Sequence, residues 1–543
     1  MIFDSVLPLP PLPRADVFSY IFRHGRQDYP KDRVLYRVDG TEKTLTLGQL
    51  EQQSLHLARS LKAEYQIQPQ CVVAIFSHDL IQYPIAYFGC LAAGATVALI
   101  PVQKQQNETD IVSHLKLVNA KLILTDQKLL SLTEKALAQY REIPVLTLDR
   151  GSASHPNLED ILTETRCYDD SHFVPVFELT TNDQAEEYTG FINRTSGSTG
   201  SMKSVLVSHA HFIATMEATR LTVPSTTNPD EDVWISPLSL GFFINAKLNM
   251  GLNILLGIPV VLMGESLESS NIDVIPRHRI TFIFVAPPLA AKLAYDRSDI
   301  DLSSVKWILS AGSPISKGVR DALSCRFGGL PLTMEWASAE TMLLTIQTED
   351  ESSRQPGSSG TLVNGVQAKV IDTETGSPCG VGEPGELYVR NRLARFKGYK
   401  DNEVANRAFT SDGWFQTGDY GYLDEKCNVY IVDRIKELIK VGEGYGSHVS
   451  AADLEGVVFG HPAVGSVVVV GCRDEAKQLD RPTAFVVLKP EFRERTEQVK
   501  KDIERFAAEG LTGLQSLSGG IRCIDQIPVT GFKINRRALR NMA

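Results

Sequence analysis

Residues 45–126 alternate between helical and extended patterns, and this alternation is the feature that most restricts how the chain can fold. Apolar residues recur at helical spacing over 45–65, and a compact β-rich run follows over 71–77. The alternation continues in the segments 80–93 and 96–102, 110–120 and 121–126, 272–280 and 281–288, and 305–312. Apolar strands bounded by Gly, Pro and Asp and separated by helices indicate a parallel sheet covered on both faces. We therefore expect an α/β fold whose large N-terminal part holds parallel-rich sheets covered by helices.

The pattern changes from Gly360 onward to short strands, which predicts a small β-barrel-like part. These strands are expected over 361–372, 385–390 and 428–433. The tail then returns to a smaller α+β set, with a helix over 451–460 and strands over 463–472 and 482–489. The charged segment 433–440 separates the two parts, so we predict one domain over 1–433 and a second over 434–543.

Composition excludes several classes of protein. The chain has 543 residues, which is long for a single domain, and its 43% hydrophobic and 22% charged residues are typical of globular proteins. Asp and Glu number 65 against 55 for Lys and Arg, and this acidic balance argues against a nucleic-acid binder. The eight cysteines form no C-x-x-C pair, and the N-terminus lacks a signal-peptide pattern. Reduced thiols and a cytoplasmic location are the expectation.

Two apolar stretches resemble membrane spans in composition. Residues 80–103 carry no charge and residues 248–264 are strongly apolar, but Gly and Pro interrupt both. A buried helix that leads into a buried strand fits each stretch better than one continuous span. We expect no membrane span.

The strongest local signal for binding is a run of small and hydroxyl residues that ends in a lysine: Thr195, Ser196, Gly197, Ser198, Thr199, Gly200, Ser201, Met202 and Lys203. Glycines let backbone N–H groups approach an anion, hydroxyls add donors, and the lysine adds positive charge. The spacing differs from the G-x-x-x-x-G-K of nucleotide-hydrolysing P-loops. A flexible linker is the alternative, but the apolar runs 191–193 and 205–209 bracket the segment tightly. We therefore predict a phosphate-binding loop.

Three further segments are ambiguous when each is taken alone. Asp419, in the segment 414–419, fits either a ribose ligand or a turn cap. The segment 433–440 is typical of an exposed charged face, and the glycines after it fail the G-x-G-x-x-G spacing of a nicotinamide site. Lys533 lies in a Gly- and Pro-containing loop just before a helix, a suitable place to present one cation, although a basic tail is usually solvated.

Together and in this order, these segments resemble the adenylate-forming superfamily: acyl-CoA and aryl-CoA ligases, luciferases and the adenylation domains of peptide synthetases. The resemblance covers residues 30–540. It extends to the stretches 77–102, 385–399 and 409–425, and the segment 431–441 is most similar to the 4-coumarate-CoA-ligase-like branch.

The resemblance implies a two-step reaction that uses ATP and Mg²⁺. A carboxylate attacks the α-phosphorus of ATP to give an acyl-adenylate and pyrophosphate, and a thiol, most often coenzyme A, then displaces AMP. Two anions must meet in the first step, so positive charge has to be concentrated on the phosphates. The small C-terminal domain would move between the steps, and the partner would be a small-molecule carboxylic acid.

The resemblance also assigns roles to single residues. It implies that the loop from Thr195 to Lys203 holds the β- and γ-phosphates, with Lys203 in a catalytic role. Glu340 matches the Mg²⁺-binding glutamate, Trp336 packs against adenine, and Ala339 stands at the α-phosphate. Further matches are Asp419 and Arg434 for the ribose hydroxyls, Lys533 for the catalytic lysine, Lys436 for the hinge, and Lys440, Gly442 and Gly444 for the thiol channel.

Several positions depart from the family pattern. Ala339 replaces a threonine whose hydroxyl contacts the α-phosphate, and losing such a hydrogen bond costs about 1.5–3 kcal/mol unless Ser338 compensates. Leu240 replaces a frequent pocket histidine, and Phe532 replaces a glycine before the catalytic lysine. The segment between Lys440 and Val449 is about three residues longer than in the family, which leaves the thiol channel open to question.

The acyl pocket is expected to draw on Phe242, Phe243, Asn245, Ala311, Gly312, Met334 and Glu335. This set is largely apolar, with polar groups at Asn245 and Glu335, and it fits an aromatic or medium-chain acid. Two alternatives stay open beside a CoA ligase. One is transfer of the acyl group to a carrier-protein thiol or an amine, and the other is a degenerate adenylate-binding protein without turnover.

Overall fold

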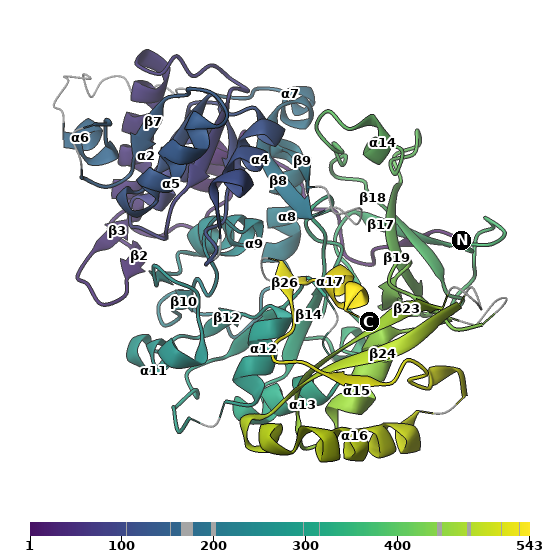
Figure 1. Ribbon diagram of the computed structural model, residues 1–543. Coiled ribbons are helices and arrows are strands. Elements are labelled where there is room, and N and C mark those ends of the chain that lie inside the picture. Colours follow the sequence, from purple (N-terminus) through teal and green to yellow (C-terminus); the bar gives the residue numbers. More distant parts are fainter. Residues whose placement is uncertain are drawn as a thin grey trace.

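Two large sheets form the framework of the N-terminal part in the computed structural model (Figure 1). The structure describes residues 1–104, 106–151, 154–163, 177–196, 202–296, 298–313, 315, 317–442, 448–474, 479–511, 513–530 and 533–542. Helices cover both sheets, as the alternation of patterns predicts. The α/β class is confirmed.

The first sheet has the strand order β7-β6-β4-β5-β8-β9. Its strands are β4 (Val72–Phe76), β5 (Thr96–Leu99), β6 (Leu122–Thr125), β7 (Val145–Thr147), β8 (Thr189–Ser196) and β9 (Met202–Ser208). All neighbouring strands are parallel except the last pair, β8 and β9. The helix α2 (Leu47–Ala63) precedes these strands, and α3 (Tyr83–Ala92), α4 (Glu108–Val118) and α5 (Gln127–Ala138) lie between them along the chain. A capping box between Thr46 and Gln49 begins α2, because each side chain bonds the other residue's backbone N–H.

The second sheet has nine strands in the order β16-β15-β14-β13-β12-β10-β11-β2-β3. They are β2 (Val34–Val38), β3 (Thr44–Thr46), β10 (Trp234–Ile235), β11 (Val260–Leu262), β12 (Phe282–Phe284), β13 (Trp307–Ser310), β14 (Leu332–Trp336), β15 (Thr345–Ile346) and β16 (Thr361–Leu362). The helices near it are α8 (His209–Arg220), α9 (Phe243–Lys247), α10 (Asn253–Leu256), α11 (Val274–His278), α12 (Pro287–Ala294) and α13 (Lys317–Arg326).

Three apolar cores hold these layers together. The largest joins both sheets through α3, α8 and the helical segment that runs from α9 to α10. A second core packs α11, α12 and α13 onto the other face of the second sheet, and a third packs α4 and α5 onto the first sheet. Each central strand is therefore buried on both faces, which explains its nearly continuous apolar sequence.

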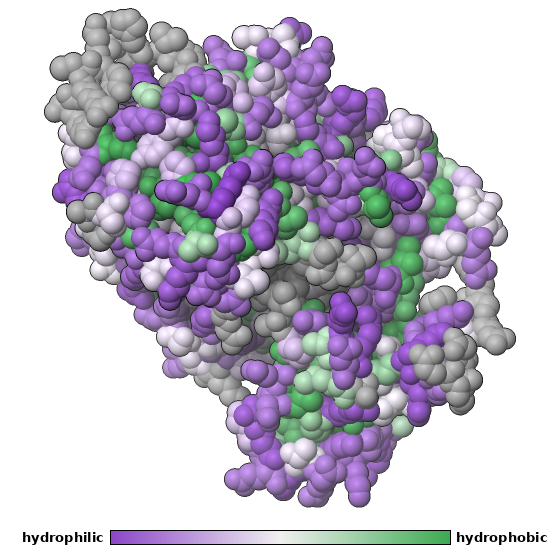
Figure 2. All heavy atoms as spheres, turned by 45° about the horizontal axis from the view of Figure 1, so that its top comes forward, coloured by the Kyte–Doolittle hydropathy of each residue, from purple (hydrophilic) through white to green (hydrophobic). Residues whose placement is uncertain are grey.

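The two apolar stretches form the buried elements that their Gly and Pro interruptions predict. The first forms α3 and then β5, and the second forms a π-helical turn, η2 (Leu248–Leu252), followed by α10 and β11. Within the described residues, the structure has no helix long and apolar enough to cross a bilayer. On the face drawn in Figure 2, most of the coloured residues are hydrophilic and the hydrophobic ones form separate patches.

A curved antiparallel sheet follows, with the order β1-β17-β18-β19-β20. It contains β1 (Phe3–Asp4), β17 (Val366–Ile371), β18 (Gly385–Asn391), β19 (Phe415–Leu423) and β20 (Val429–Arg434). Burial alternates along β19, so one face packs on the main core and the other meets solvent. Register shifts in β18–β19 and β19–β20 bend the sheet, and the predicted barrel-like part is confirmed as a half-barrel.

Residues after 434 form a smaller unit with its own core. The long strands β23 (Val464–Asp474) and β24 (Leu479–Leu488) pair antiparallel, and β25 (Ile521–Cys523) joins β24. The helices α15 (Ala451–Phe459) and α16 (Thr496–Gly510) pack against this sheet. Short hairpins link β21 (Ile439–Lys440) to β22 (His448–Val449) and β26 (Val529–Thr530) to β27 (Lys533–Ile534), and α17 (Arg536–Asn541) follows the second hairpin.

Candidate nucleotide-binding site

The predicted phosphate loop connects the two antiparallel strands at the edge of the first sheet. Thr195 on β8 lies opposite Lys203 on β9, so the two ends of the loop are held together. Gly197, Ser198, Thr199 and Gly200 lie outside the described residues, and their role stays a prediction. The strands that bracket the loop are those expected from its apolar flanks.

Lys203 and Glu340 are brought together by a residue that the sequence analysis did not select. The Nζ atom of Lys203 lies 5.0 Å from the centroid of the Tyr399 ring, within the range of a cation–π contact. The hydroxyl of Tyr399 donates to Oε1 of Glu340 at 2.5 Å. Burial and the neighbouring Glu340 carboxylate raise the pKa of Tyr399 far above its usual value, so this hydroxyl stays a donor.

The position of Tyr399 follows from backbone pairing with β9. Leu206 N donates to the carbonyl of Gly398, and Lys400 N donates to the carbonyl of Ser204. These bonds place Tyr399 opposite Val205, two residues from Lys203. Tyr399 ends the family-like stretch 385–399, so the resemblance was the one signal that pointed to it.

A second cluster joins Trp336, Asp419 and Arg434. The indole Nε1 of Trp336 donates to Oδ2 of Asp419 at 2.8 Å, and Nε of Arg434 lies 2.6 Å from Oδ1 of the same carboxylate. Asp419 and Arg434 face each other in the register of β19 and β20. The Asp419 side chain is 5% exposed and that of Arg434 is 44% exposed, so the cluster reaches from the core to the surface.

The turn over residues 337–341 links the two clusters. Nδ2 of Asn193, near the end of β8, donates to the carbonyl of Ala339 at 3.4 Å. The hydroxyl of Ser338 lies 3.0 Å from that of Thr341 and accepts from the Thr341 backbone N–H. In this structure Ser338 therefore serves the local turn, and the position of Ala339 carries no hydroxyl of its own.

The donor set fits an Mg²⁺ ion that arrives with a nucleotide. Glu340 is 9% exposed, and Tyr399 holds one of its carboxylate oxygens. Among the described residues, no three His, Cys, Asp or Glu side chains gather closely enough to form a metal site. Magnesium is usually held by one or two carboxylates together with substrate phosphates, and a single glutamate beside the predicted phosphate loop meets that requirement.

Lys533 lies in a hairpin that the C-terminal helix anchors. Its backbone pairs with Thr530, and its side chain lies outside the described part of the chain. Three residues further on, Arg536 Nη1 lies 2.8 Å from Oε1 of Glu455 and donates to the carbonyl of Val469. The hairpin and α17 are drawn in yellow in Figure 1.

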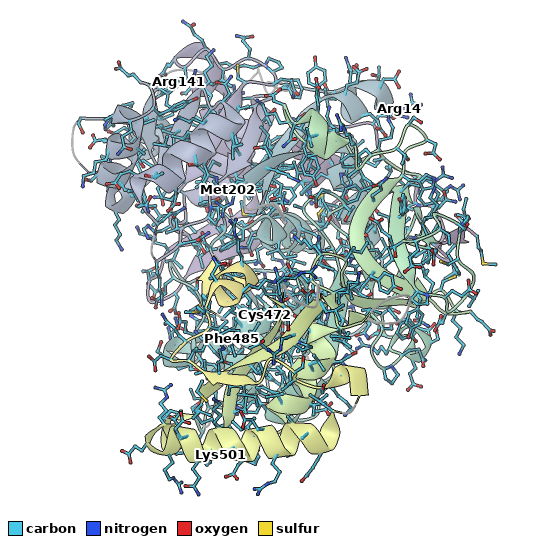
Figure 3. The ribbon with its side chains drawn as sticks, turned by 45° about the vertical axis from the view of Figure 1, so that its right-hand side comes forward. Arg14, Arg141, Met202, Cys472, Phe485 and Lys501 are labelled. Atoms are coloured by element: carbon cyan, nitrogen blue, oxygen red, sulfur yellow. The ribbon has the colours of Figure 1, made fainter. Side chains whose placement is uncertain are left out.

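The predicted hinge borders a cavity of about 460 Å³. Lys436 contributes to its lining, with Glu437, Leu438, Gly471, Cys472, Arg473, Asp480 and Arg540. Nη2 of Arg540 lies 2.5 Å from Oε2 of Glu437, so an ion pair ties the hinge segment to α17. Figure 3 labels Cys472 and Phe485, which lie on the paired strands β23 and β24.

The predicted thiol-channel residues lie in or beside the hairpin β21–β22. Lys440 is exposed, and its backbone N–H donates to Oδ2 of Asp480 at 3.3 Å. Gly442 follows the strand, and Gly444 lies outside the described residues. The structure therefore positions the start of the predicted channel and leaves its role as a prediction.

The predicted acyl-pocket residues are divided between the largest core and the second core. Phe242 and Phe243 are half-buried at the start of α9 and pack against the largest core, which also contains Ala311. Asn245 is buried and donates to the carbonyls of Leu238 and Ser239 at 3.1 and 2.8 Å, so it fixes the preceding loop. Gly312 is exposed.

Met334 and Glu335 occupy neighbouring positions on β14 but lie in different surroundings. Met334 packs in the second core, with α11, α12 and α13. Glu335 forms a buried ion pair with Lys247, with 2.5 Å between Oε2 and Nζ. Burial raises the pKa of Glu335, and the Lys247 ammonium opposes that shift. Lys247 was not selected from the sequence, although a lone cation inside an apolar stretch requires a buried partner.

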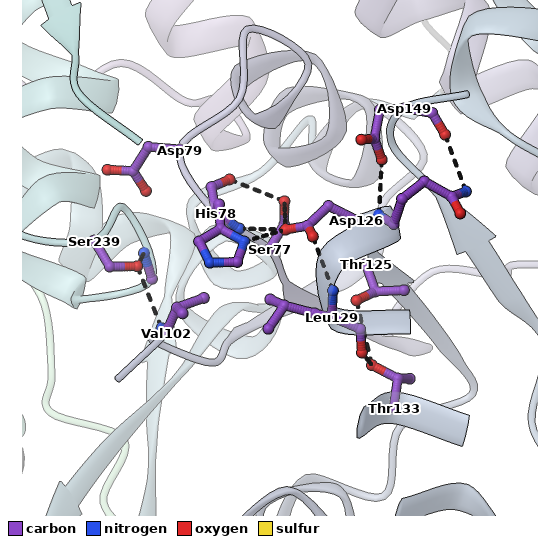
Figure 4. Close-up of polar contacts among 12 residues, drawn as sticks. Ser77, His78, Asp79, Val102, Thr125, Asp126, Leu129, Thr133, Asp149 and Ser239 are labelled. Carbon is purple, nitrogen blue, oxygen red and sulfur yellow. Dashed lines mark hydrogen bonds and ion pairs between the residues drawn. The ribbon is translucent and has the colours of Figure 1, made fainter. Parts of the chain in front are cut away.

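A polar group at Asp79 also becomes visible only in the structure, and Figure 4 shows Asp79 beside His78. Oδ1 of Asp79 accepts from the backbone N–H of Leu240 at 2.8 Å, and Oδ2 is buried without a hydrogen-bond partner among the described residues. Burial raises the pKa of Asp79 from 3.8 to about 7. Next to it, the imidazole of His78 lies 2.8 Å from Asp126, and this contact raises the pKa of His78.

The raised pKa of Asp79 predicts a pH dependence of stability. Between pH 3.8 and about 7 the folded chain holds a proton at Asp79 that the unfolded chain has lost, so stability falls as pH rises through this range. The full effect is about 3–5 kcal/mol. The Asp79→Asn variant cannot titrate and is expected to lack this decline in urea denaturation at pH 5 and pH 8. An unchanged pH slope in the variant would contradict the assignment.

Comparison with known families identifies both parts of the chain. The family model described as AMP-binding enzyme matches residues 22–400. The model described as AMP-binding enzyme C-terminal domain matches residues 453–532. The first match ends before Asp419 and Arg434, and the second ends one residue before Lys533.

Individual relatives match over nearly the whole length. The chain is 29% identical over 527 residues to a luciferin 4-monooxygenase of Photuris pensylvanica, which covers 95% of this chain and 90% of that protein. It is 27% identical over 533 residues to 4-coumarate–CoA ligase 1 of Oryza sativa subsp. japonica, with 93% and 88% covered. The crystal structure of the anthranilate CoA ligase AuaEII with anthranoyl-AMP has the same fold, with a TM-score of 0.83, 21% identity and 98% of both chains covered.

Proposed function

Because this chain belongs to the AMP-binding enzyme family, which consists of adenylate-forming enzymes, we propose that it activates a carboxylic acid with ATP and passes the acyl group to a thiol. The observation that carries the proposal is the convergence of the two clusters on the segment 336–340. Trp336 binds the Asp419–Arg434 pair, and Glu340 binds Tyr399 beside Lys203.

The cluster of Trp336, Asp419 and Arg434 suits the nucleoside. The Asp419 carboxylate accepts from the Trp336 indole and faces Arg434, and carboxylate oxygens are suitable acceptors for the two hydroxyls of a ribose. The bond to Trp336 also fixes the indole, which would pack against adenine. Arg434 balances the buried charge of Asp419 and orients its carboxylate.

The cluster of Lys203, Tyr399 and Glu340 suits the phosphates. Lys203 brings positive charge to the end of the predicted loop, and the carboxylate of Glu340 would hold Mg²⁺, which supplies charge neutralisation when bound. In the first step, an oxygen of the acid bonds to the α-phosphorus as the bond from that phosphorus to pyrophosphate breaks. Lys533 would bridge the attacking carboxylate and the α-phosphate.

In the second step, a thiolate bonds to the acyl carbon and AMP leaves with the electron pair. Coenzyme A is the proposed acceptor, and the name of the rice relative fits this choice. The domain over 434–543 would turn about Lys436 between the steps, with the Glu437–Arg540 ion pair carrying α17 along with the hinge. Lys440, Gly442 and Gly444 would then face the thiol.

The acid we propose is aromatic or of medium chain length. The half-buried side chains of Phe242 and Phe243 and the buried Ala311 offer an apolar surface in the largest core. Transfer to a carrier-protein thiol or an amine is the alternative that the longer 441–448 segment favours. Adenylate binding without turnover is the alternative that Ala339 favours.

The proposal predicts pyrophosphate release that depends on an acid, ATP and Mg²⁺. A panel of aromatic and medium-chain acids is assayed with and without coenzyme A, and the products are identified by mass spectrometry. An acyl-CoA product is expected for at least one acid. Pyrophosphate release with a carrier-bound or amide product instead supports the alternative acceptor. No acyl-adenylate with any acid would overturn the proposed function.

A further inference from the structure

A buried ion pair lies next to the segments proposed to bind the acid. Lys247 Nζ and Glu335 Oε2 are 2.5 Å apart, and the two side chains are 2% and 0% exposed. This is the one hydrogen bond that the Lys247 ammonium makes within the described residues. The other carboxylate oxygen, Oε1 of Glu335, is buried without a hydrogen-bond partner there. The pair therefore keeps both an unused acceptor and unused N–H donors.

Stability alone does not account for such a pair. Each charge loses its hydration on burial, and only a fully hydrogen-bonded arrangement offsets that cost. Two apolar residues of similar volume would fold at least as well in its place. An incompletely satisfied pair in a packed interior is instead the arrangement expected where a bound molecule supplies the missing hydrogen bonds.

The ion pair lies between the segment proposed to bind the acid and the segment proposed to bind the nucleotide. Lys247 lies four residues after Phe243, so the two share one face of α9, which begins in the proposed acyl segment. The π-helical turn η2 starts at the next residue, and such turns occur frequently at functional sites. Glu335 directly precedes Trp336, whose indole donates to Asp419.

A second polar group with unused hydrogen-bonding capacity lies two residues after Lys247 in the same helical segment. Asn249, within η2, donates through Nδ2 to Oδ1 of Asn245 at 2.7 Å. Its own Oδ1 is buried and has no hydrogen-bond partner among the described residues. Asn245 in turn holds the loop over residues 238–239. The segment 245–249 therefore holds two buried polar groups with unused hydrogen-bonding capacity, the Lys247 ammonium and Oδ1 of Asn249.

We propose that Lys247 and Glu335 form the polar end of the acyl pocket and select a carboxylic acid whose acyl group bears a hydroxyl. This inference rests on the proposed function. A hydroxyl donates its proton to Oε1 of Glu335 and accepts from an N–H of Lys247, which satisfies both groups at once. An ammonium group meets repulsion from Lys247, and a second carboxylate meets repulsion from Glu335. An unsubstituted acyl group leaves both partners unsatisfied.

The test compares matched acids that differ by one hydroxyl: 4-hydroxycinnamate with cinnamate, and 3-hydroxyoctanoate with octanoate. The full-length protein is expected to show a kcat/KM for pyrophosphate release about tenfold or more higher for the hydroxylated member of at least one pair. The Lys247→Met/Glu335→Leu double variant should lose that preference, measured as the ratio of kcat/KM for the two acids of a pair within the same variant. Glu335→Gln keeps the shape of the side chain and should reduce the preference without abolishing folding.

The exposed ion pair between Lys317 and Asp321 provides a matched control, because it also has a 2.5 Å contact but exposures of 79% and 61%. The Lys317→Met/Asp321→Leu variant should retain the wild-type preference. Equal rates for both members of every pair, or a preference that survives in the Lys247→Met/Glu335→Leu variant, would overturn the inference while leaving acid activation intact. Absence of adenylate formation with every acid would instead remove the proposed function on which it rests.

Discussion

Replacing Lys533 with alanine is expected to slow acid-dependent pyrophosphate release by about a hundredfold or more at saturating ATP and acid. Removing one preorganised group that stabilises developing charge costs about 10²–10³ in rate. The backbone around Lys533 is held by the β26–β27 pairing and by Arg536, which is anchored to Glu455. The substitution should therefore remove the cation without displacing the hairpin.

The same variant separates the two proposed steps. Since Lys533 is assigned to the first step, the variant should still form thioester from supplied acyl-adenylate and coenzyme A at close to the wild-type rate. Lys501, exposed on α16, offers a control, and Lys501→Ala should leave both steps unchanged (Figure 3). Rapid pyrophosphate release by Lys533→Ala would contradict its catalytic assignment.

Removing only one member of the buried pair is expected to have the largest effect on stability. Glu335→Leu leaves the Lys247 ammonium desolvated and uncompensated, which should lower the free energy of unfolding by about 3–5 kcal/mol. The Lys247→Met/Glu335→Leu variant removes both charges and is expected to unfold at or above the wild-type free energy. Urea denaturation followed by tryptophan fluorescence measures both, because Trp234, Trp307 and Trp336 lie in the second sheet.

The exposed pair again serves as the reference for this measurement. Lys317→Met should change the free energy of unfolding by less than about 0.5 kcal/mol, because solvent screens both charges. If Glu335→Leu were as stable as the wild-type protein, the ammonium of Lys247 would not need a buried partner. Loss of hydration by the Lys247 ammonium would then not explain its pairing with Glu335.

Local sequence patterns predicted the helices and strands well, because the spacing of apolar residues along an element reflects which of its faces is buried. The expected helix over 45–65 is α2, and the expected strand over 71–77 is β4. Local patterns did not indicate which distant strands pair with each other. β2 pairs with β11, more than two hundred residues away, and Phe3 pairs with Ala368. Apolar residues that alternate with a period of two show which face of a strand is buried, but they do not indicate which strand pairs with it.

In the candidate site, too, the sequence indicated the residues, and the structure showed which of them are in contact. Glu340, Asp419, Arg434 and Trp336 were selected by their order along the chain, and the structure joins them through short contacts. Tyr399 was missed as a contact because its role depends on the backbone bonds that place it opposite Val205. These bonds link β9 to a loop almost two hundred residues further on, and the sequence does not show them.

The sequence by itself determined the fold class, the family resemblance and the chemical groups available for catalysis, because these depend on local periodicity and on residue types in order. Only the tertiary structure showed which charged side chains form a buried ion pair. Lys247 and Glu335 are 88 residues apart, and the sequence analysis selected only Glu335, as a polar pocket residue. Their burial against each other makes them a pair, since the energy of a charge depends on what surrounds it in space.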